Sequence, residues 1–218
     1  MVFPLTLEQI DTANRIHDQL SDWVLVDRSL DLLSKSFPEF DLESTLLKAV
    51  AVNELYYTNV FAIVRMAKHM SQILIEPGNM EPCLVDRLAT VAIKEGKPPR
   101  RFVSFASKFA HFFIATDRFP IYDSYALRMI KLHLGVRKDI WKSSGPYTEY
   151  AEMFRTLKNQ VCPNYTNRQL DRYLWIAGQY LAWKKNGKAQ INGELLQIFK
   201  NQEYQKQLTK IVETKKNE

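Results

Sequence analysis

The spacing of apolar residues predicts helices along almost the whole chain. Between Thr6 and Leu33, apolar side chains recur every three or four residues, and a second run of this kind covers 42–74. The same spacing predicts helices over 84–96, 102–116, 123–135, 149–160 and 167–185. No segment shows the alternation typical of a β-strand. We therefore expect an all-α fold.

Short local signals indicate where these helices begin and end. Pro38 breaks the chain and Asp41 stands at a cap position, while the run over 42–74 divides into two helices near 55–59. Asp123 and Gly135 flank another helix as cap and terminator. Three segments are predicted to lie outside the main helices: a Pro- and Gly-containing loop at 75–83, an extended basic linker at 97–101, and a lysine-rich peripheral helix or tail at 186–218.

Composition and charge narrow the possible partners. The chain has 218 residues, 46% of them hydrophobic, which suffices for one large helical domain or for two helical lobes that share a cleft. Lys and Arg number 30 against 24 acidic residues, a formal charge of +6. This balance favours a polyanionic partner.

Cysteine content and the apolar runs predict the compartment. Cys83 and Cys162 are the two cysteines, too few for a four-cysteine zinc or iron–sulfur cluster and unsuited to a disulfide framework. We expect no metal and no other cofactor. The start of the chain lacks a signal-peptide pattern, and no apolar run is long enough to span a bilayer. We expect a cytoplasmic protein, associated with the nucleoid in a bacterial cell, that binds no membrane and acts as a monomer.

Three stretches, taken in order, resemble one family. They are LYYTNVFAIVRMAKH, ASKFAHFF and FPIYDSYALRMIKLHLG. Together they resemble the helix-hairpin-helix DNA glycosylase superfamily, which includes endonuclease III and the 8-oxoguanine glycosylases, over roughly residues 42–185. The resemblance implies two helical lobes with a central cleft near 53–59 and 100–125, within a single globular unit over 1–185.

The resemblance places Asp123 on the family's catalytic aspartate and Lys108 on the lysine of its bifunctional members. Cleavage of an N-glycosidic bond develops positive charge on the sugar, and a carboxylate at a helix N-terminus stays ionised and stabilises that charge. Asp123 alone is also an ordinary N-cap residue. Lys108, a cation within an apolar helix, is either a nucleophile that forms a Schiff base or an electrostatic contact to DNA.

The same resemblance implies a set of DNA-binding residues. Tyr56, Tyr57 and Asn59 match the loop that probes the base stack, although either tyrosine also fits a core contact. Asn53 either lines the pocket of the flipped base or hydrogen-bonds the base that has lost its partner. The family's hairpin carries glycines, whereas the corresponding stretch here, RRFVSFAS, has none. In place of those glycines we expect Ser104 and Ser107 to donate hydrogen bonds to phosphate. The positive charge at this hairpin is assigned to Lys94, Lys97, Arg100 and Arg101.

The sequence thus predicts a DNA glycosylase, and the nucleophile role of Lys108 would add AP lyase action. Its partner is double-stranded DNA carrying a flipped damaged or modified base. Two other classes stay open: a module that binds DNA or RNA structure without chemistry, and a helical protein–protein adaptor. The base, and the choice between genome repair and defence against modified foreign DNA, are left open by the sequence.

Overall fold

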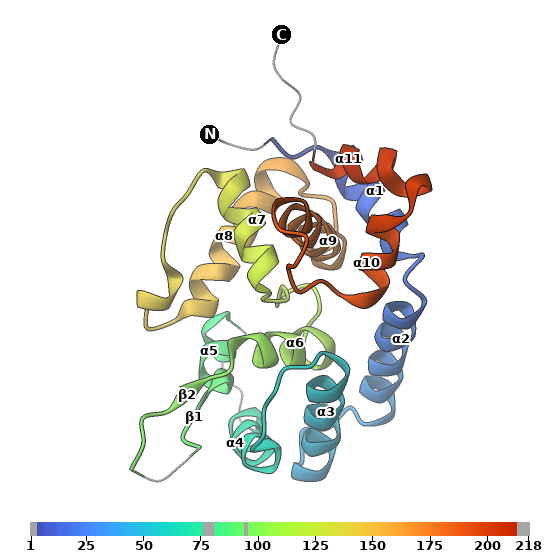
Figure 1. Cartoon of the computed structure of the whole chain (residues 1–218). Helices are drawn as coiled ribbons and strands as arrows, with labels where there is room; N and C mark the ends of the chain where they lie inside the picture. Colours follow the sequence, from blue (N-terminus) through green and yellow to red (C-terminus); the bar gives the residue numbers. More distant parts are fainter. Residues whose placement is uncertain (1–3, 76–80, 94–95, 213–218) are drawn as a thin grey trace. The chain divides into compact units, whose positions relative to one another are not determined.

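The computed structural model describes residues 4–75, 81–93 and 96–212, and this part of the chain is helical, as the apolar spacing predicts. Its first six α-helices are α1 (Leu7–His17), α2 (Ser21–Ser36), α3 (Leu42–Leu55), α4 (Ile63–Ile75), α5 (Cys83–Ala89) and α6 (Val103–Phe113) (Figure 1). The other five are α7 (Ser124–Leu134), α8 (Pro146–Val161), α9 (Asn167–Lys185), α10 (Gly193–Lys200) and α11 (Gln205–Val212). Two 3₁₀ helices, η1 (Ile140–Lys142) and η2 (Gln202–Tyr204), and two short strands, β1 (Thr90–Val91) and β2 (Arg100–Arg101), complete it. The prediction of an all-α fold is confirmed.

The chain divides into two compact units. Unit 1 comprises Met1–Leu25, Asp123–Lys138 and Met153–Glu218, and unit 2 comprises Val26–Tyr122 and Asp139–Glu152. The four divisions along the chain fall within α2, between Tyr122 and Asp123, between Lys138 and Asp139, and within α8.

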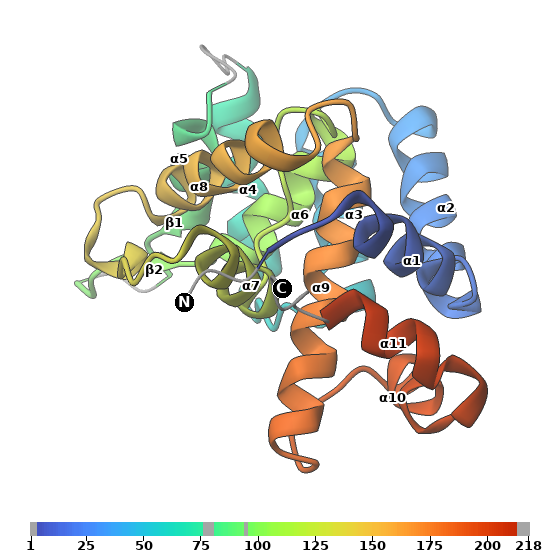
Figure 2. The same cartoon turned by 90° about the horizontal axis from the view of Figure 1, so that it is seen from above.

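Unit 1 is organised around α9. Helices α1, α7 and α11 all pack against this helix, and α1 also packs against α11 (Figures 1 and 2). The residues after 185 contribute to the same core, because the side chains of Leu195, Phe199, Leu208 and Ile211 are buried. Phe199 of α10 packs its ring edge-to-face on Tyr180 of α9, with ring centroids 5.2 Å apart. Such aromatic pairs add stability beyond simple burial.

Unit 2 is organised around α6. This helix packs against α3 and α5, α3 packs against α4, and α4 contacts α5 (Figure 1). Phe105, Phe109 and Phe113 lie four residues apart on α6, and their rings form a continuous buried row. A helix with so much apolar surface is stable only inside a core, which explains why nearly all of α6 is buried.

The helix predicted over 84–96 is wrong beyond Ala89. Helix α5 ends there, and the β-branched residues Thr90 and Val91 instead form β1, antiparallel to β2 at the end of the basic linker. Thr90 pairs with Arg101 and Val91 with Arg100. β-branched side chains lose rotamer freedom in a helix and fit a strand well, so the available partner strand decides the conformation.

Several predicted segments extend outside the described residues. The predicted loop at 75–83 includes residues 76–80, Lys94 belongs to the predicted basic cluster, and residues 213–218 end the predicted tail; these residues are not described. Among the helices that are described, none combines the length and the apolar composition that a membrane crossing requires.

Candidate functional site

Asp123 is the N-cap of α7 in unit 1, as its position in the sequence predicts. Its backbone is extended, with φ −142° and ψ 147°, and its side chain turns back over the first turn of the helix. Oδ1 accepts hydrogen bonds from the backbone N–H groups of Tyr125, at 2.7 Å, and Ala126, at 3.3 Å. These bonds satisfy two of the N–H groups that have no partner within a helix.

The cap leaves half of the carboxylate of Asp123 available. Both cap bonds use Oδ1, and Oδ2 has no hydrogen bond to any residue in the described part of the chain. The side chain is half-buried, so Oδ2 remains open to a ligand or to solvent. The positive end of the α7 dipole favours negative charge at this position. Asp123 therefore combines a structural cap with a carboxylate oxygen that the cap does not need.

Lys108 lies on α6 of unit 2 and is 6% exposed. Its Nζ donates to Ser104 Oγ at 2.7 Å and lies 3.3 Å from the carbonyl oxygens of Ser104 and Tyr122. The ammonium also lies 5.5 Å from the ring centroid of Tyr56. Oxygen acceptors and an aromatic face offset the cost of burying a cation. Ser104, Tyr122 and Tyr56, which make these contacts with Lys108, all belong to unit 2.

The two serines predicted to bind phosphate make hydrogen bonds within unit 2 instead. Ser107 is 0% exposed; its hydroxyl donates to the carbonyl of Ser104 and accepts from the backbone N–H of Tyr122. Ser104, which is half-buried, accepts the hydrogen bond from Lys108. Ser104, Ser107 and Lys108 thus connect α6 to the segment that ends at Tyr122, the residue before Asp123. In this conformation the Ser107 hydroxyl is inaccessible to phosphate.

The last turn of α3 contains Asn53, and the loop between α3 and α4 contains Tyr56, Tyr57 and Asn59, the residues predicted to meet the flipped base and the base stack. Asn53 holds this loop together, because its Oδ1 accepts from Thr58 Oγ1 at 2.9 Å and from Val60 N at 2.8 Å. Tyr57 and Asn59 have positive φ angles of 50° and 57°. Such left-handed conformations are uncommon outside glycine, and they mark a loop whose shape is imposed by its surroundings.

The two tyrosines of this loop have different environments. Tyr56 is half-buried, with its ring 5.6 Å from that of Phe112 and its hydroxyl 3.4 Å from Asp27 Oδ1. Tyr57 is 77% exposed. Tyr56 is thus a packing residue, and Tyr57 is the aromatic ring available at the surface. Phe61, which was not predicted as a site residue, is 93% exposed; the aromatic residue in TNVFAIV is the signal that marks it.

Arg100 and Arg101 are exposed residues of β2. The guanidinium of Arg100 lies 5.7 Å from the centroid of the Phe102 ring, and Arg101 Nη1 donates to the carbonyl of Ser143 at 3.1 Å. Lys97 is also exposed. Both arginines keep donor groups for a further ligand, because a guanidinium carries five N–H donors.

A second buried lysine, Lys48 of α3, was not singled out in the sequence. Its Nζ donates to the carbonyl of Glu39 at 2.6 Å and lies 4.2 Å from the centroid of the Phe40 ring. Burial lowers the pKa of Lys48 below its ordinary value, opposed by the charges of Asp41 and Glu39. These contacts hold the segment before α3 against the helix, which indicates a structural role.

Comparison with known proteins identifies the family of this helical chain. A family model named HI_0787_N, described as an N-terminal domain, matches residues 8–117. A protein of Haemophilus influenzae, strain Rd, named as an uncharacterized protein, is 30% identical over 187 residues, which covers 78% of this chain and 83% of that protein. The chain belongs to the HI_0787_N family. No solved structure matches it significantly.

Proposed function

We propose that this protein is a DNA glycosylase that hydrolyses the N-glycosidic bond of a damaged or modified base, with Asp123 as the transition-state anion. The observation that supports this most is the carboxylate of Asp123, which caps α7 through Oδ1 and keeps Oδ2 uncommitted. Departure of the base leaves positive charge at C1′, and a fixed anion there lowers the barrier. The same oxygen can orient the attacking water or accept its proton.

Lys108 offers a second activity on the same substrate. Its amine, once deprotonated, attacks C1′ as the base leaves, and the resulting Schiff base allows strand cleavage by elimination. The alternative role is electrostatic, with the ammonium attracting DNA phosphate. Borohydride separates the two roles, because reduction of a Schiff base leaves a covalent protein–DNA adduct.

A base can be cleaved only after it leaves the stack, and an inserted side chain can fill the vacancy. Tyr57 and Phe61 are the exposed aromatic residues of the loop between α3 and α4. We propose that this loop approaches the duplex and that Arg100 and Arg101 contact its phosphates. We also propose that the two helical lobes and the cleft implied by the superfamily resemblance apply to this chain.

The decisive experiment compares the wild type with Asp123→Asn on duplexes that carry a panel of modified bases, including bulky modified cytosines. Asparagine is also a good N-cap, so α7 should keep its start while the negative charge is lost. We expect free base to be released by the wild type and at least ~100-fold more slowly by the variant. Equal release on every substrate would remove the assigned role. Circular dichroism provides the control for folding.

One observation favours a second function, a module that binds nucleic-acid structure without chemistry. The stretch that corresponds to the glycine hairpin begins with β2 and continues directly into α6, and the N-cap residue Phe102 makes no side-chain cap. A backbone of this kind lacks the close phosphate approach that glycines permit. This alternative predicts salt-sensitive binding that survives both Asp123→Asn and Lys108→Gln, with no base released by any variant.

A further inference from the structure

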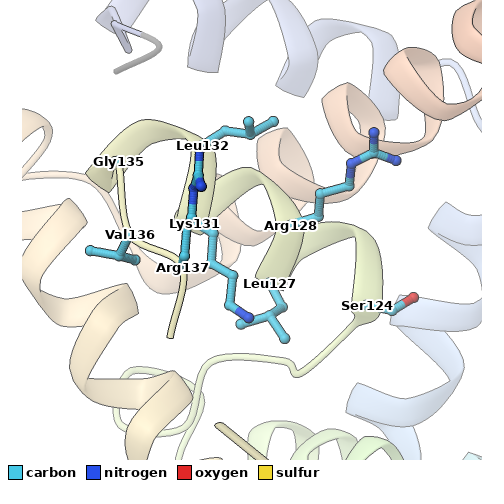
Figure 3. A pocket seen from close by; sticks show the side chains of 8 residues that line it. All are labelled: Ser124, Leu127, Arg128, Lys131, Leu132, Gly135, Val136 and Arg137. Carbon is cyan, nitrogen blue, oxygen red and sulfur yellow. The ribbon is translucent and has the colours of Figure 1, made fainter. Parts of the chain in front are cut away.

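The outer face of α7, in unit 1, carries a hollow rich in positive charge. Its volume is about 560 Å³, and it is lined by Ser124, Leu127, Arg128, Lys131, Leu132, Gly135, Val136 and Arg137 (Figure 3). The five residues from α7 recur at intervals of three and four, so they share one side of the helix. We name this hollow the α7 groove. The groove lies on this side of α7 because the intervening residues of the helix, among them Ala126, Met129 and Ile130, are buried in the core on the opposite side.

The end of α7 closes the groove. Gly135 adopts a left-handed conformation with φ 67°, and the backbone N–H groups of Gly135 and Val136 both donate to the carbonyl of Lys131. This turn reverses the chain at the end of the helix. Val136 and Arg137 are thereby returned to the face of α7 that carries Arg128 and Lys131. A residue with a Cβ atom is strained at this φ angle, so glycine is required for the shape.

The charge in the α7 groove is of one sign. Arg128, Lys131 and Arg137 line it, whereas no Asp or Glu among the described residues does so. None of these three cations forms an ion pair within the described part of the chain. Three cations gathered around a concave surface, without acidic neighbours in its lining, repel one another and gain stability when an anion binds.

We infer that the α7 groove is a phosphate-binding site. Two guanidinium groups and one ammonium suit phosphate oxygens, to which arginine donates in a bidentate manner. The hydroxyl of Ser124 adds a further donor, and the apolar contacts of Leu127 and Val136 suit the sugar or another carbon group beside the phosphate. The phosphate comes from a nucleic-acid strand or from a phosphorylated small molecule. This inference goes beyond the proposed function, because binding requires neither Asp123 nor a modified base.

The test uses the full chain with two charge-matched triple variants. The groove variant carries Arg128→Gln, Lys131→Gln and Arg137→Gln. The control variant carries Lys184→Gln, Lys185→Gln and Lys188→Gln, three exposed cations elsewhere in unit 1. Each variant lowers the formal charge by three, so a difference between them reports position and not total charge. Thermal unfolding verifies that both variants fold.

Two probes distinguish the sources of phosphate. The first is a fluorescein-labelled, undamaged DNA duplex, measured by anisotropy over a range of salt concentrations; the second is pyrophosphate, measured by titration calorimetry. We expect the groove variant to bind the duplex at least ~10-fold more weakly than the wild type. The slope of the logarithm of the binding constant against the logarithm of the salt concentration should also become shallower by about 1–3. The control variant should stay near the wild type in both measurements.

Loss of pyrophosphate binding in the groove variant, with duplex binding unchanged, would assign the groove to a phosphorylated small molecule. Equal losses in both triple variants would overturn the inference, because total charge would then explain them. It is also overturned if the wild type binds neither probe. Since undamaged DNA is used, these outcomes are independent of whether the protein releases a base.

Discussion

A Cβ atom on Gly178 of α9 would lie 2.8 Å from the carbonyl oxygen of Tyr125 and equally close to the Tyr125 Cβ atom. Helix α9 therefore approaches the first turn of α7, the turn that Asp123 caps, through a position that only glycine can occupy. Glycine is normally unfavourable within a helix, by ~1 kcal/mol relative to alanine. This close contact explains its presence in the middle of α9.

The close contact between Gly178 and Tyr125 can be tested by substitution. Gly178→Ala should lower the free energy of unfolding by about 1–2 kcal/mol, because overlap with backbone atoms outweighs the gain in helix propensity. Urea denaturation measures the loss. Gly193→Ala is the matched control, since nothing lies within 4 Å of a Cβ atom there. If Gly178→Ala is as stable as the control, the two helices are not held in close contact.

The start of α8 depends on a distant carboxylate. Asp86 of α5 accepts from the backbone N–H groups of Tyr147 and Thr148, each at 2.9 Å, and from Thr148 Oγ1 at 2.7 Å. Asp86 thus accepts the hydrogen bonds that a local N-cap residue normally accepts at the start of a helix. We predict that Asp86→Ala lowers the free energy of unfolding by about 1–2 kcal/mol, as measured by urea denaturation. A partial loss in Asp86→Asn is expected, and no loss in either variant would exclude the capping role.

The two cysteines should differ in reactivity. Cys83 is exposed, whereas Cys162 is 1% exposed and burial raises the pKa of its thiol to about 11. Only the thiolate reacts with a disulfide reagent. At pH 8, Ellman's reagent should label one thiol of the native protein rapidly and both thiols in urea. Cys83→Ser should abolish the rapid phase; a rapid phase that persists would contradict the buried position of Cys162.

Lys48 predicts a pH dependence of stability. Burial depresses its pKa in the folded protein below the ordinary value of 10.5. At a pH between the lowered pKa of the folded protein and the ordinary value of the unfolded chain, the unfolded chain binds more protons than the folded one. The stability conferred by Lys48 therefore rises with pH in this range. The unfolding free energy of the wild type, relative to Lys48→Met, should therefore increase as pH rises towards 10.5. Urea titrations of both proteins across this window measure the difference, and a constant gap would refute the shift.

Substitution of Phe61 should affect DNA binding without affecting the stability of the fold. The side chain is 93% exposed, so Phe61→Ser should change the free energy of unfolding by less than ~0.5 kcal/mol. If the loop between α3 and α4 enters the base stack, the same change should reduce the fluorescence increase of 2-aminopurine in a bound duplex. Ile75→Ser, at a 70% exposed position of α4, is the control. Equal signals from both variants would exclude Phe61 as the side chain that enters the base stack.

The helices of the site were predictable because their signals are local. Asp123 and Gly135 define α7 by a cap bond and a left-handed terminator, and the limits of α9, Asn167–Lys185, agree with those predicted from apolar spacing. Caps and apolar periodicity act within a few residues of the chain, so they can be read without knowledge of the fold.

Other features required contacts between distant segments. Thr90 and Val91 continue a helical pattern in the sequence, yet a partner strand ten residues later makes them a strand. Tyr56 and Tyr57 are adjacent and alike, yet contacts with distant residues such as Phe112 of α6 leave Tyr56 half-buried while Tyr57 is exposed.

By itself, therefore, the sequence determined the helical class, the capped start of α7 and the basic character of the chain. The tertiary structure decided which polar groups are used internally, as with Ser107, and which line an open groove, as with Arg128 and Lys131. The physical reason is that burial and hydrogen-bond pairing depend on residues far apart in the chain, which local patterns do not encode.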